Sequence, residues 1–578
     1  MADSGPLYLG LDLSTQQLKV LAVKSNLETV FEGAVSFDAD LPSYGVRKGV
    51  FVNEKDDEVF APVAMWIEAL DLLLQRMKNR GFDFSKVKGI SGAGQQHGSV
   101  YWSNSAESIL SSLSTEKSLL EQLSPKAFSW KFSPNWQDHS TSEQVAAFDD
   151  RVGGDDLLAK ATGSGGHHRF TGPQILRFVQ LHPEEYAATS RISLVSSFLA
   201  SLFLGKIAPM DISDVCGMNL FNIETESWDD RLISLAASPS GTPDPAATKA
   251  LYEKLGEAEP DGGKILGSIS SYFVKKWGFP EDCAIIPSTG DNPSTILALP
   301  LHPQDAIVSL GTSTTILMST EKYYPSPAYH MFNHPTQPGL YMFMLCYKNG
   351  GLAREEIRDA INKAKGVTDH SWSHFNKAAV ETPVLGKTSS GDKAKVGFYF
   401  PLPEIVPNVQ NPGFYRFEVD GAAKKVEESE GWDITADARA IVESQALSMR
   451  IRSAPLLDPK NPQPRRVYLV GGGSRNKAIA QVLADVLGGI EGVFKLDVGN
   501  ACALGAAYKA LWAVERGDSG ESFEDLIGKR WNEEGKVEKV MDGYRKGIWE
   551  AYGEVAQAYS EAEARVQRGE AKGDISLI

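Results

Sequence analysis

Residues 7–24 read LYLGLDLSTQQLKVLAVK, two apolar runs joined by the polar tetrapeptide Ser14-Thr15-Gln16-Gln17. Short apolar runs on either side of a tight polar turn are typical of a β-hairpin. A third run, residues 28–37, extends this hairpin to a three-stranded antiparallel meander. Apolar residues at three- and four-residue steps then predict a long helix over residues 54–80, and a strand follows at residues 87–93.

Similar parts return in the second half of the chain. We expect a strand at residues 305–310, a polar turn at Gly311–Thr315 and a return strand after it. A further strand, residues 466–470, runs into Gly471-Gly472-Gly473. This order predicts a duplicated α/β fold with a cleft between two halves that divide near residues 299–304. The duplication is one of architecture, because no residue-level repeat accompanies it.

The turn at residues 12–17 has the residue types that suit a metal-bound phosphate. Asp12 lies at the end of a buried strand, where a carboxylate is costly unless a cation or hydrogen-bond donors satisfy it. The hydroxyls of Ser14 and Thr15 follow, and this combination suits hydrated Mg²⁺ beside the terminal phosphates of a nucleotide. A carboxylate that caps its own turn is the alternative. The Gly311–Ser313 turn would surround a small anion with N–H and O–H donors.

Composition excludes several classes of partner. The 578 residues carry a formal net charge of −16, from 58 basic and 74 acidic side chains, which disfavours nucleic acid and anionic membrane surfaces. Residues 1–6 do not show the basic start and apolar core expected of a signal peptide, and the longest apolar stretch, residues 192–205, is too short to span a bilayer and predicts a buried helix. Four separated cysteines without a CxxC pair fit a reducing compartment. We therefore expect a cytoplasmic protein.

Three other motifs are weaker than they look. The segment Leu385-Gly386-Lys387-Thr388 ends like a P-loop, but Glu381 stands where its first glycine is needed. The segment at residues 471–476 has Asn476 where a dinucleotide fingerprint needs glycine, although backbone N–H groups at this helix start still suit a nucleotide. The pair His167-His168 lacks metal-ligand spacing, and we expect a solvated loop there.

Six segments resemble the FGGY carbohydrate kinases and, within that family, the eukaryotic-type xylulose kinases (xylulokinases). The resemblance extends from about residue 7 to residue 560. The pair TGDNP and GAGQQHG points to xylulose as the substrate. The six segments are DLSTQQLKV (12–20), SGAGQQHGS (91–99), RFTG (169–172), RISLVSS (191–197), TGDNP (289–293) and VSLGT (308–312).

The resemblance implies a duplicated actin-like, ribonuclease H-like ATPase fold with two domains and a central cleft. Residues 1–303 would form the N-terminal domain, which binds the sugar and contributes the magnesium and phosphate turn. Residues 304–578 would form the C-terminal, nucleotide-binding domain. The implied reaction is phosphorylation of D-xylulose to D-xylulose 5-phosphate with ATP and Mg²⁺, in pentose catabolism. Residues 397–404 lack the Gly-Glu-Arg of many bacterial relatives, a departure that does not involve the implied base, sugar or metal positions.

The resemblance also implies residue roles. Asp291 is the implied general base, which takes the proton of the attacking sugar hydroxyl, and Asp12 is the implied Mg²⁺ ligand. The implied sugar-binding residues are His97, Arg169, Asp291 and Asn292, with Gln96 adjacent. The implied nucleotide-binding residues are Ser14, Thr15, Gln16 and Gln17 in the first turn, Gly311, Thr312 and Ser313 in the second, Gly471, Gly472, Gly473 and Asn476 in the glycine loop, and Trp372 against the adenosine.

Each of these residues has an ordinary structural alternative when it is considered alone. His97 is also typical of a hydrogen-bonded core histidine, and Arg169 of a surface ion pair. Asp291 before Asn-Pro is a common turn starter, and Trp372 is of a type that usually lies in a core.

Alternatives to the substrate and to the class also remain open. A kinase for ribulose, glycerol, gluconate or another polyol would use the same machinery. A catalytically silent sugar sensor would not need both Asp12 and Asp291, and an actin-like filament former would not need His97, Arg169 and Asn292. The sequence leaves a monomer and a homodimer equally open.

Overall fold

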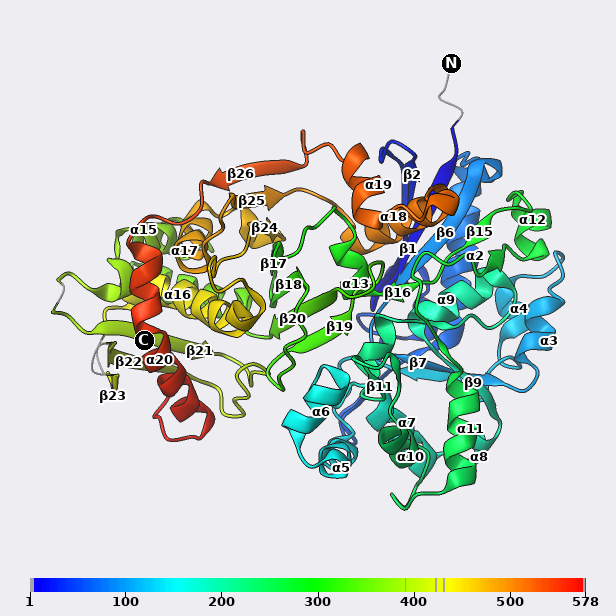
Figure 1. Cartoon of the computed structure of the whole chain (residues 1–578), viewed down its shortest axis with the longest axis horizontal. Coiled ribbons are helices and arrows are strands. Elements are labelled where there is room, and N and C mark those ends of the chain that lie inside the picture. The colour runs from blue at the N-terminus through cyan, green and yellow to red at the C-terminus, as the bar shows by residue number, and fades with distance from the viewer. Residues whose placement is uncertain (1–4, 390, 422–423, 430–431, 575–576, 578) are drawn as a thin grey trace. The chain divides into compact units, whose positions relative to one another are not determined.

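The computed structural model describes residues 5–389, 391–421, 424–429, 432–574 and 577, and these fall into two compact units (Figure 1). The division near residue 301 lies close to the expected one near residue 303, but two later segments join the first unit. That unit consists of Met1–Leu301, Pro325–Met342 and Gly499–Trp531, and the second consists of His302–Tyr324, Phe343–Val498 and Asn532–Ile578.

The first unit is built on a sheet with the strand order β14-β15-β6-β1-β2-β3, and β16 also pairs with β6. β1, β2 and β3 are antiparallel neighbours, which confirms the predicted meander, whereas β6 runs parallel to β1. The strands are β1 (Leu7–Leu13), β2 (Gln17–Lys24), β3 (Thr29–Ser36), β6 (Val87–Gly94), β14 (Gly267–Ser268), β15 (Ala284–Ile285) and β16 (Thr289–Gly290).

The predicted helix over residues 54–80 is wrong in its first part. β4 (Phe51–Asn53) and β5 (Glu58–Pro62) occupy that region, and helix α2 spans Val63–Asn79. The helix begins directly after Pro62, because proline has no N–H to donate but is tolerated at a helix start. The apolar side chain of Val59 is buried, but this residue lies in strand β5 and not in the helix.

Helix α18 (Ala501–Glu515) comes late in the chain but belongs to the first unit, where it packs on β1 and β6. A Cβ atom at Gly10 would lie 1.9 Å from the carbonyl oxygen of Ala503, so only glycine in β1 admits the helix at this distance. The predicted division between residues 303 and 304 assigns this helix to the other domain. The small residues that allow the contact are far apart in sequence, so no local pattern indicates it.

Shorter elements complete the first unit. The expected buried helix at residues 192–205 divides into the end of β9 and helix α9. The helices are α1 (Phe37–Asp40), α3 (Ala106–Ser111), α4 (Leu119–Leu123), α5 (Ser142–Val152), α6 (Asp155–Thr162), α7 (Thr171–Leu181), α8 (Pro183–Ala187), α9 (Val195–Leu204), α10 (Asp230–Ala236), α11 (Pro245–Leu255), α12 (Ser271–Trp277), α13 (Asp291–Ile296) and α19 (Phe523–Arg530); the strands are β7 (Ser99–Ser103), β8 (Phe132–Pro134), β9 (Thr189–Leu194), β10 (Met210–Asp211), β11 (Phe221–Asn222), β12 (Ser227–Trp228), β13 (Ala258–Glu259) and β19 (His330–Asn333).

The second unit repeats the hairpin with a parallel neighbour. β17 (Ala306–Leu310) is antiparallel to β18 (Thr314–Thr320) and parallel to β24 (Arg466–Val470), as predicted. The remaining strands are β20 (Tyr341–Tyr347), β25 (Gly492–Leu496) and β26 (Val537–Met541) in the same sheet, and β21 (Ala394–Phe400), β22 (Gly413–Asp420) and β23 (Lys425–Glu428) in a three-stranded sheet.

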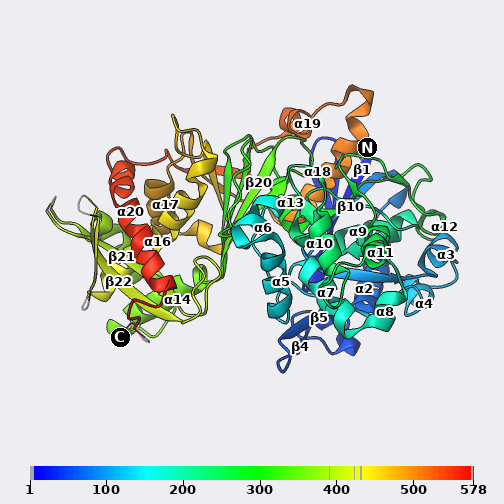
Figure 2. The same cartoon turned by 60° about the horizontal axis from the view of Figure 1, so that its bottom comes forward.

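Five α-helices complete the part of the second unit that the model describes. α16 and α20 pack on the three-stranded sheet (Figure 2), and the expected polar helix near the C-terminus is α20. The helices are α14 (Gly351–Ala364), α15 (Ser373–Glu381), α16 (Ile434–Ser453), α17 (Lys477–Leu487) and α20 (Ile548–Gln567). Among the helices that the model describes in both units, none combines the length and the hydropathy needed to cross a membrane.

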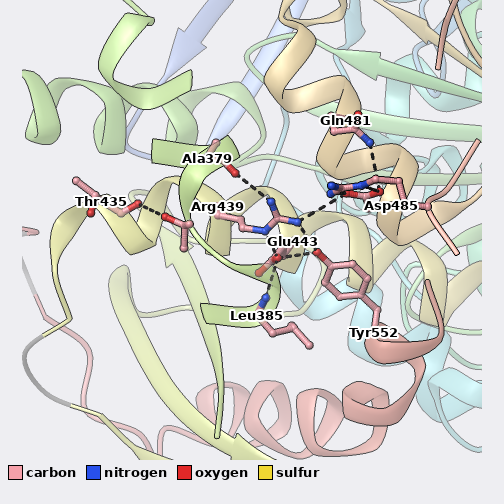
Figure 3. Close-up of polar contacts among 10 residues, drawn as sticks. Ala379, Leu385, Thr435, Arg439, Glu443, Gln481, Asp485 and Tyr552 are labelled. Atoms are coloured by element: carbon pink, nitrogen blue, oxygen red, sulfur yellow. Dashed lines mark hydrogen bonds and ion pairs between the residues drawn. The ribbon is translucent and has the colours of Figure 1, made fainter. Parts of the chain in front are cut away.

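A buried polar network holds the helices of the second unit together (Figure 3). Arg439 on α16 donates to Glu443 at 2.6 Å, to the Ala379 carbonyl of α15 at 3.1 Å and to the Tyr552 hydroxyl of α20 at 3.1 Å. Its guanidinium also lies 3.7 Å from the Asp485 carboxylate of α17. One arginine thus connects four helices. Buried carboxylates such as these need a cation and hydrogen-bond donors, and the guanidinium supplies both.

Candidate active site

Parallel pairing brings three predicted site segments of the first unit to one edge of the sheet. Asp12 of β1 lies beside Ala93 of β6, and Gly290 of β16 lies beside Gly94. The chain therefore leaves β6 into Gln95-Gln96-His97 and leaves β16 into Asp291 at the same edge. Ligands of open α/β sheets bind at the carboxyl ends of the parallel strands.

Asp12 is a buried carboxylate that lacks part of its hydrogen bonding. It is 2% exposed, its Oδ2 lies 3.4 Å from the Lys19 ammonium, and its Oδ1 has no hydrogen-bond partner among the residues that the model describes. Burial raises the pKa of Asp12, and the charge of Lys19 opposes the shift. An orphaned buried carboxylate oxygen fits a cation. The described residues hold no cluster of three or more metal-ligating side chains, so other ligands to such a cation would come from a bound molecule or water.

Asp291 stands at the first position of α13. Its Oδ1 accepts hydrogen bonds from the Asn292 backbone at 2.8 Å and from the Asn292 amide at 3.1 Å. Burial, and next the negative charge of Asp12, raise the pKa of Asp291 to about 7. A carboxylate with a pKa near neutrality is well matched to accepting a proton at physiological pH.

Gln96 and His97 follow β6 and are both buried. The Gln96 Oε1 accepts from the Asn292 amide at 2.9 Å, and its Nε2 lies with the Asp214 carboxyl beside Gly290. His97 has a φ of 74°, a conformation that is rare for a residue with a side chain and is often found at functional sites. Its Nδ1 lies 2.8 Å from the Gly217 carbonyl, so that nitrogen carries the proton and Nε2 is an acceptor. Burial holds the pKa of His97 well below its usual range, which keeps the ring neutral.

Arg169 lies near His97 through the ring of Phe170. Phe170 stacks on His97 with 4.4 Å between centroids, and the Arg169 guanidinium lies 5.5 Å from the same ring. His167 packs on Phe170 and on His330, so the expected solvated loop at residues 167–168 is instead partly buried. Burial keeps the pKa of His167 well below its usual range.

Hydrogen bonds of side-chain and backbone groups hold the first turn in place. The Ser14 hydroxyl donates to the Gln17 carbonyl at 2.9 Å, and the Gln16 carbonyl accepts from the Phe37 backbone. Thr15 donates to Gln95 at 3.3 Å, which connects the turn to the segment after β6.

In the second unit, the predicted phosphate turn and glycine loop lie against each other. A Cβ atom at Gly471 would lie 3.1 Å from the Leu310 carbonyl, and one at Gly473 would lie 2.8 Å from Leu310 Cβ. The turn residues Gly311, Thr312 and Ser313 are exposed, as are Gly471 and Gly472. The start of α14 lies beside the Gly311–Ser313 turn, because the Gly351 backbone N–H donates to the Gly311 carbonyl at 3.0 Å. These backbones offer N–H groups without side chains in front of them.

Asn476 and Trp372 are connected through α15. The Asn476 Oδ1 caps α17 by accepting from Ala478 and Ile479, and its Nδ2 donates to Asn376 at 2.7 Å. Trp372 directly precedes α15, one helical turn before Asn376, and is partly exposed with the Arg358 guanidinium 4.8 Å from its ring. The tryptophan is thus not a core residue.

Family models match both halves of the chain. The N-terminal domain of the FGGY family of carbohydrate kinases matches residues 134–298, and the C-terminal domain of the same family matches residues 306–514. The chain belongs to the FGGY family of carbohydrate kinases. It is therefore a sugar kinase by family, and the resemblance on which the sequence analysis relied is confirmed.

Relatives of this FGGY kinase span its whole length. A protein of Aspergillus fumigatus named "Probable D-xylulose kinase A" is 58% identical over 99% of this chain and 100% of that protein. A protein of Aspergillus terreus with the same name is 57% identical over 99% of both. The crystal structure of xylulose kinase from Rhodospirillum rubrum has a TM-score of 0.72, at 17% identity, and the match covers 97% of this chain and 99% of that one. The expected two-domain actin-like fold is thereby confirmed.

Two side chains that the sequence did not predict as site residues, Trp136 and Asp214, lie beside the predicted site residues of this FGGY kinase. Trp136 is 45% exposed and donates from its indole to Thr15 at 2.9 Å, so an aromatic face stands next to the first turn. Asp214 is buried, accepts from Ser196, and lies against Gly290, where an added Cβ would be 2.6 Å from it. Burial raises the pKa of Asp214 to about 8. The sequence signal for Trp136 is a tryptophan within the polar segment Pro134–Asp138.

Proposed function

We propose that this FGGY kinase transfers the γ-phosphoryl group of ATP to the 5-hydroxyl of D-xylulose, giving D-xylulose 5-phosphate. The observation that carries the proposal is the full-length 58% identity to a protein named as a probable D-xylulose kinase. The intact set of polar residues at the sheet edge of the first unit supports it.

Asp291 is the proposed general base. As the sugar hydroxyl attacks the phosphorus, its O–H bond breaks and the Asp291 carboxylate takes the proton. The raised pKa matters here, because a carboxylate near its pKa at neutral pH accepts a proton more readily than an ordinary aspartate does. Asn292 holds that carboxylate through two hydrogen bonds and so fixes the direction of the proton transfer.

His97, Arg169, Gln96 and Asn292 are the proposed sugar ligands. A ketose presents hydroxyl groups that both donate and accept, and its site must pair each of them. The neutral His97 offers an acceptor at Nε2, and Gln96 offers a buried amide group that can donate. Arg169 supplies a cluster of N–H donors for oxygen atoms of the sugar.

ATP is the proposed phosphoryl donor, bound mainly by the second unit, with Mg²⁺ held at Asp12. A bound Mg²⁺ would neutralise charge on the phosphates during the transfer. The chain's own contribution is the carboxylate of Asp12, the donors of the two turns and the Gly471–Gly473 loop, while Trp372 and Asn476 would contact the nucleoside. The first unit would bind the sugar. The reaction would require the sugar-binding and the nucleotide-binding residues to act together on one bound sugar and one bound ATP.

We further propose that the kinase works in the cytoplasm, where ATP is available. The four cysteines, all within the described part of the chain, form no disulfide, which suits a reducing compartment.

The test is an assay of ADP release with D-xylulose, D-ribulose, glycerol and gluconate as acceptors, for wild type and for Asp291→Asn. The proposal predicts strong stimulation by D-xylulose and weak stimulation by the others. Turnover with a different acceptor would retain the kinase and overturn the substrate. Binding of D-xylulose without ADP release would favour a sensor.

A further inference from the structure

Arg169 is held by a histidine from a distant part of the chain. The Arg169 Nη2 lies 3.1 Å from the Nε2 of His330, although the two residues are 161 positions apart. We propose that His330 is a positioning residue, which aims the Arg169 guanidinium at the ketose and thereby sets the affinity for the sugar. This inference rests on the proposed function, in which Arg169 is a sugar ligand.

The direction of the hydrogen bonds follows from the chemistry of arginine. A guanidinium only donates, so the Nε2 of His330 must be the acceptor and cannot carry a proton. The remaining ring nitrogen of a neutral histidine then carries the hydrogen. That nitrogen, Nδ1, lies 2.9 Å from the hydroxyl of Ser164, which accepts from it. The chain Ser164, His330, Arg169 thus has one defined direction.

The surroundings of His330 keep the ring neutral and fixed. It is 4% exposed, and the rings of His167 and Phe170 pack against it at 4.8 and 5.5 Å between centroids. Burial, with the neighbouring His167 ring and the charge of Arg169, holds the pKa of His330 well below its usual range. A protonated ring would face Arg169 with a second positive charge, so neutrality is a condition for the contact.

The backbone also ties the histidine to its partner. β19 carries His330, and the Met331 backbone donates to the Gly163 carbonyl at 2.8 Å. Gly163 has a φ of 79°, and a Cβ atom there would lie 2.2 Å from the Met331 carbonyl. Ser164 and His330 are therefore held next to each other by the main chain, with the ring orientation left to their hydrogen bond.

This arrangement assigns a sugar-side role to a segment from the C-terminal half. Residue 330 lies within the region matched by the C-terminal family model, but the segment Pro325–Met342 belongs to the first unit. His330 leaves no hydrogen-bonding nitrogen for a sugar hydroxyl, because both ring nitrogens are occupied. Its effect on the ketose must therefore pass through Arg169.

The test is steady-state kinetics of His330→Leu, His330→Gln and Ser164→Ala. A hydrogen bond to a charged group predicts that His330→Leu raises the KM for D-xylulose roughly 10- to 100-fold, with the KM for ATP unchanged and kcat within about threefold. His330→Gln retains an acceptor for Arg169 and should recover most of the affinity. Ser164→Ala removes the acceptor that fixes the ring tautomer and should raise the KM for the sugar by a smaller factor, about threefold.

Two controls make the outcome decisive. His334→Leu replaces another buried histidine of the same segment, which bonds to Thr336 instead, and should leave both KM values as in wild type. In an Arg169→Met background, His330→Leu should add nothing, because its effect passes through the arginine. An equal loss in the two backgrounds, or parallel changes in both KM values, overturns the positioning role.

The failure of the proposed function would look different from the failure of this inference. If wild type phosphorylates another ketose and not D-xylulose, the proposed substrate is wrong, and the same variants are measured with that ketose. If wild type is active and the His330→Leu variant is folded with an unchanged sugar KM, the substrate stands and the positioning role fails. Thermal melting of each variant separates unfolding from a loss of affinity.

Discussion

The two hairpin turns of the molecule share a backbone plan and differ in charge. In the first unit, the residue one position before the strand end is Asp12, and it pairs across the hairpin with Lys19. At the matching position of the second unit stands Ser309, which pairs with Thr315. Both hairpins have a parallel strand beside the first strand, β6 in one unit and β24 in the other. A duplicated architecture therefore places an acid at one turn and only neutral groups at the other.

The difference separates two chemical tasks. A buried carboxylate with an orphaned oxygen suits a cation and also raises the pKa of Asp291. A neutral turn beside exposed glycine backbones suits anionic phosphates, which a carboxylate would repel. Each of the following variants or conditions tests one side of this division.

The largest effect is expected from Asp291→Asn. Loss of the general base should lower kcat by roughly 10²- to 10⁴-fold, with little change in sugar binding. The pKa of Asp291 is raised from 3.8 to about 7, so its carboxylate makes the folded protein less stable as the pH rises through that range. The variant should therefore melt at a higher temperature than wild type at pH 8, by a few degrees. Retained turnover together with an unchanged melting temperature contradicts the assignment.

Arg439→Met tests the second unit alone. The change removes the arginine that pairs with Glu443 in a buried network, while Asp485 keeps its ion pair with Arg545, and breaking a buried pair costs about 3–5 kcal/mol of unfolding free energy. Urea unfolding measures that loss. Arg565→Met, at a partly exposed pair with Glu561, is the matched control and should cost under about 1 kcal/mol. Equal costs for the two variants would mean that the network contributes nothing beyond surface pairing.

Local sequence was enough to predict the hairpins and to single out the motifs that contain Asp12 and Asp291. Their motifs lie at strand ends, and parallel pairing of β1, β6 and β16 then brings them to one edge. The start of α2 was missed because the apolar spacing continues across Pro62. The joining of α18 and His330 to the first unit was missed for a different reason. Gly10 with Ala503, and Arg169 with His330, are contacts between distant residues that no local pattern records.

The pH dependence is a smaller effect that tests the influence of Asp12. With the pKa of Asp291 at about 7 in the free enzyme, the base is protonated below that pH. The value of kcat/KM for D-xylulose should then fall about tenfold for each pH unit below 7 and level off above it. Saturating Mg²⁺ should move the midpoint to lower pH, because a cation at Asp12 offsets the negative charge that raises the pKa. A midpoint near 4 at every Mg²⁺ concentration argues against this coupling.

Ser309→Asp asks whether the second turn tolerates the acid of the first. Ser309 is partly buried on β17, and no lysine faces it there, since its cross-strand partner is Thr315. A new carboxylate would repel nucleotide phosphates by about 1 kcal/mol, the value for two unit charges about 4 Å apart in water, which predicts a KM for ATP about fivefold higher with the KM for D-xylulose unchanged. Ser309→Asn has nearly the same size without the charge and should behave as wild type. Salt screens exposed charges, so the difference between the two variants should shrink as ionic strength rises. If Ser309→Asn raises the KM for ATP as much as Ser309→Asp does, the larger side chain and not its charge weakens nucleotide binding. The neutrality of the second hairpin would then have no electrostatic cause.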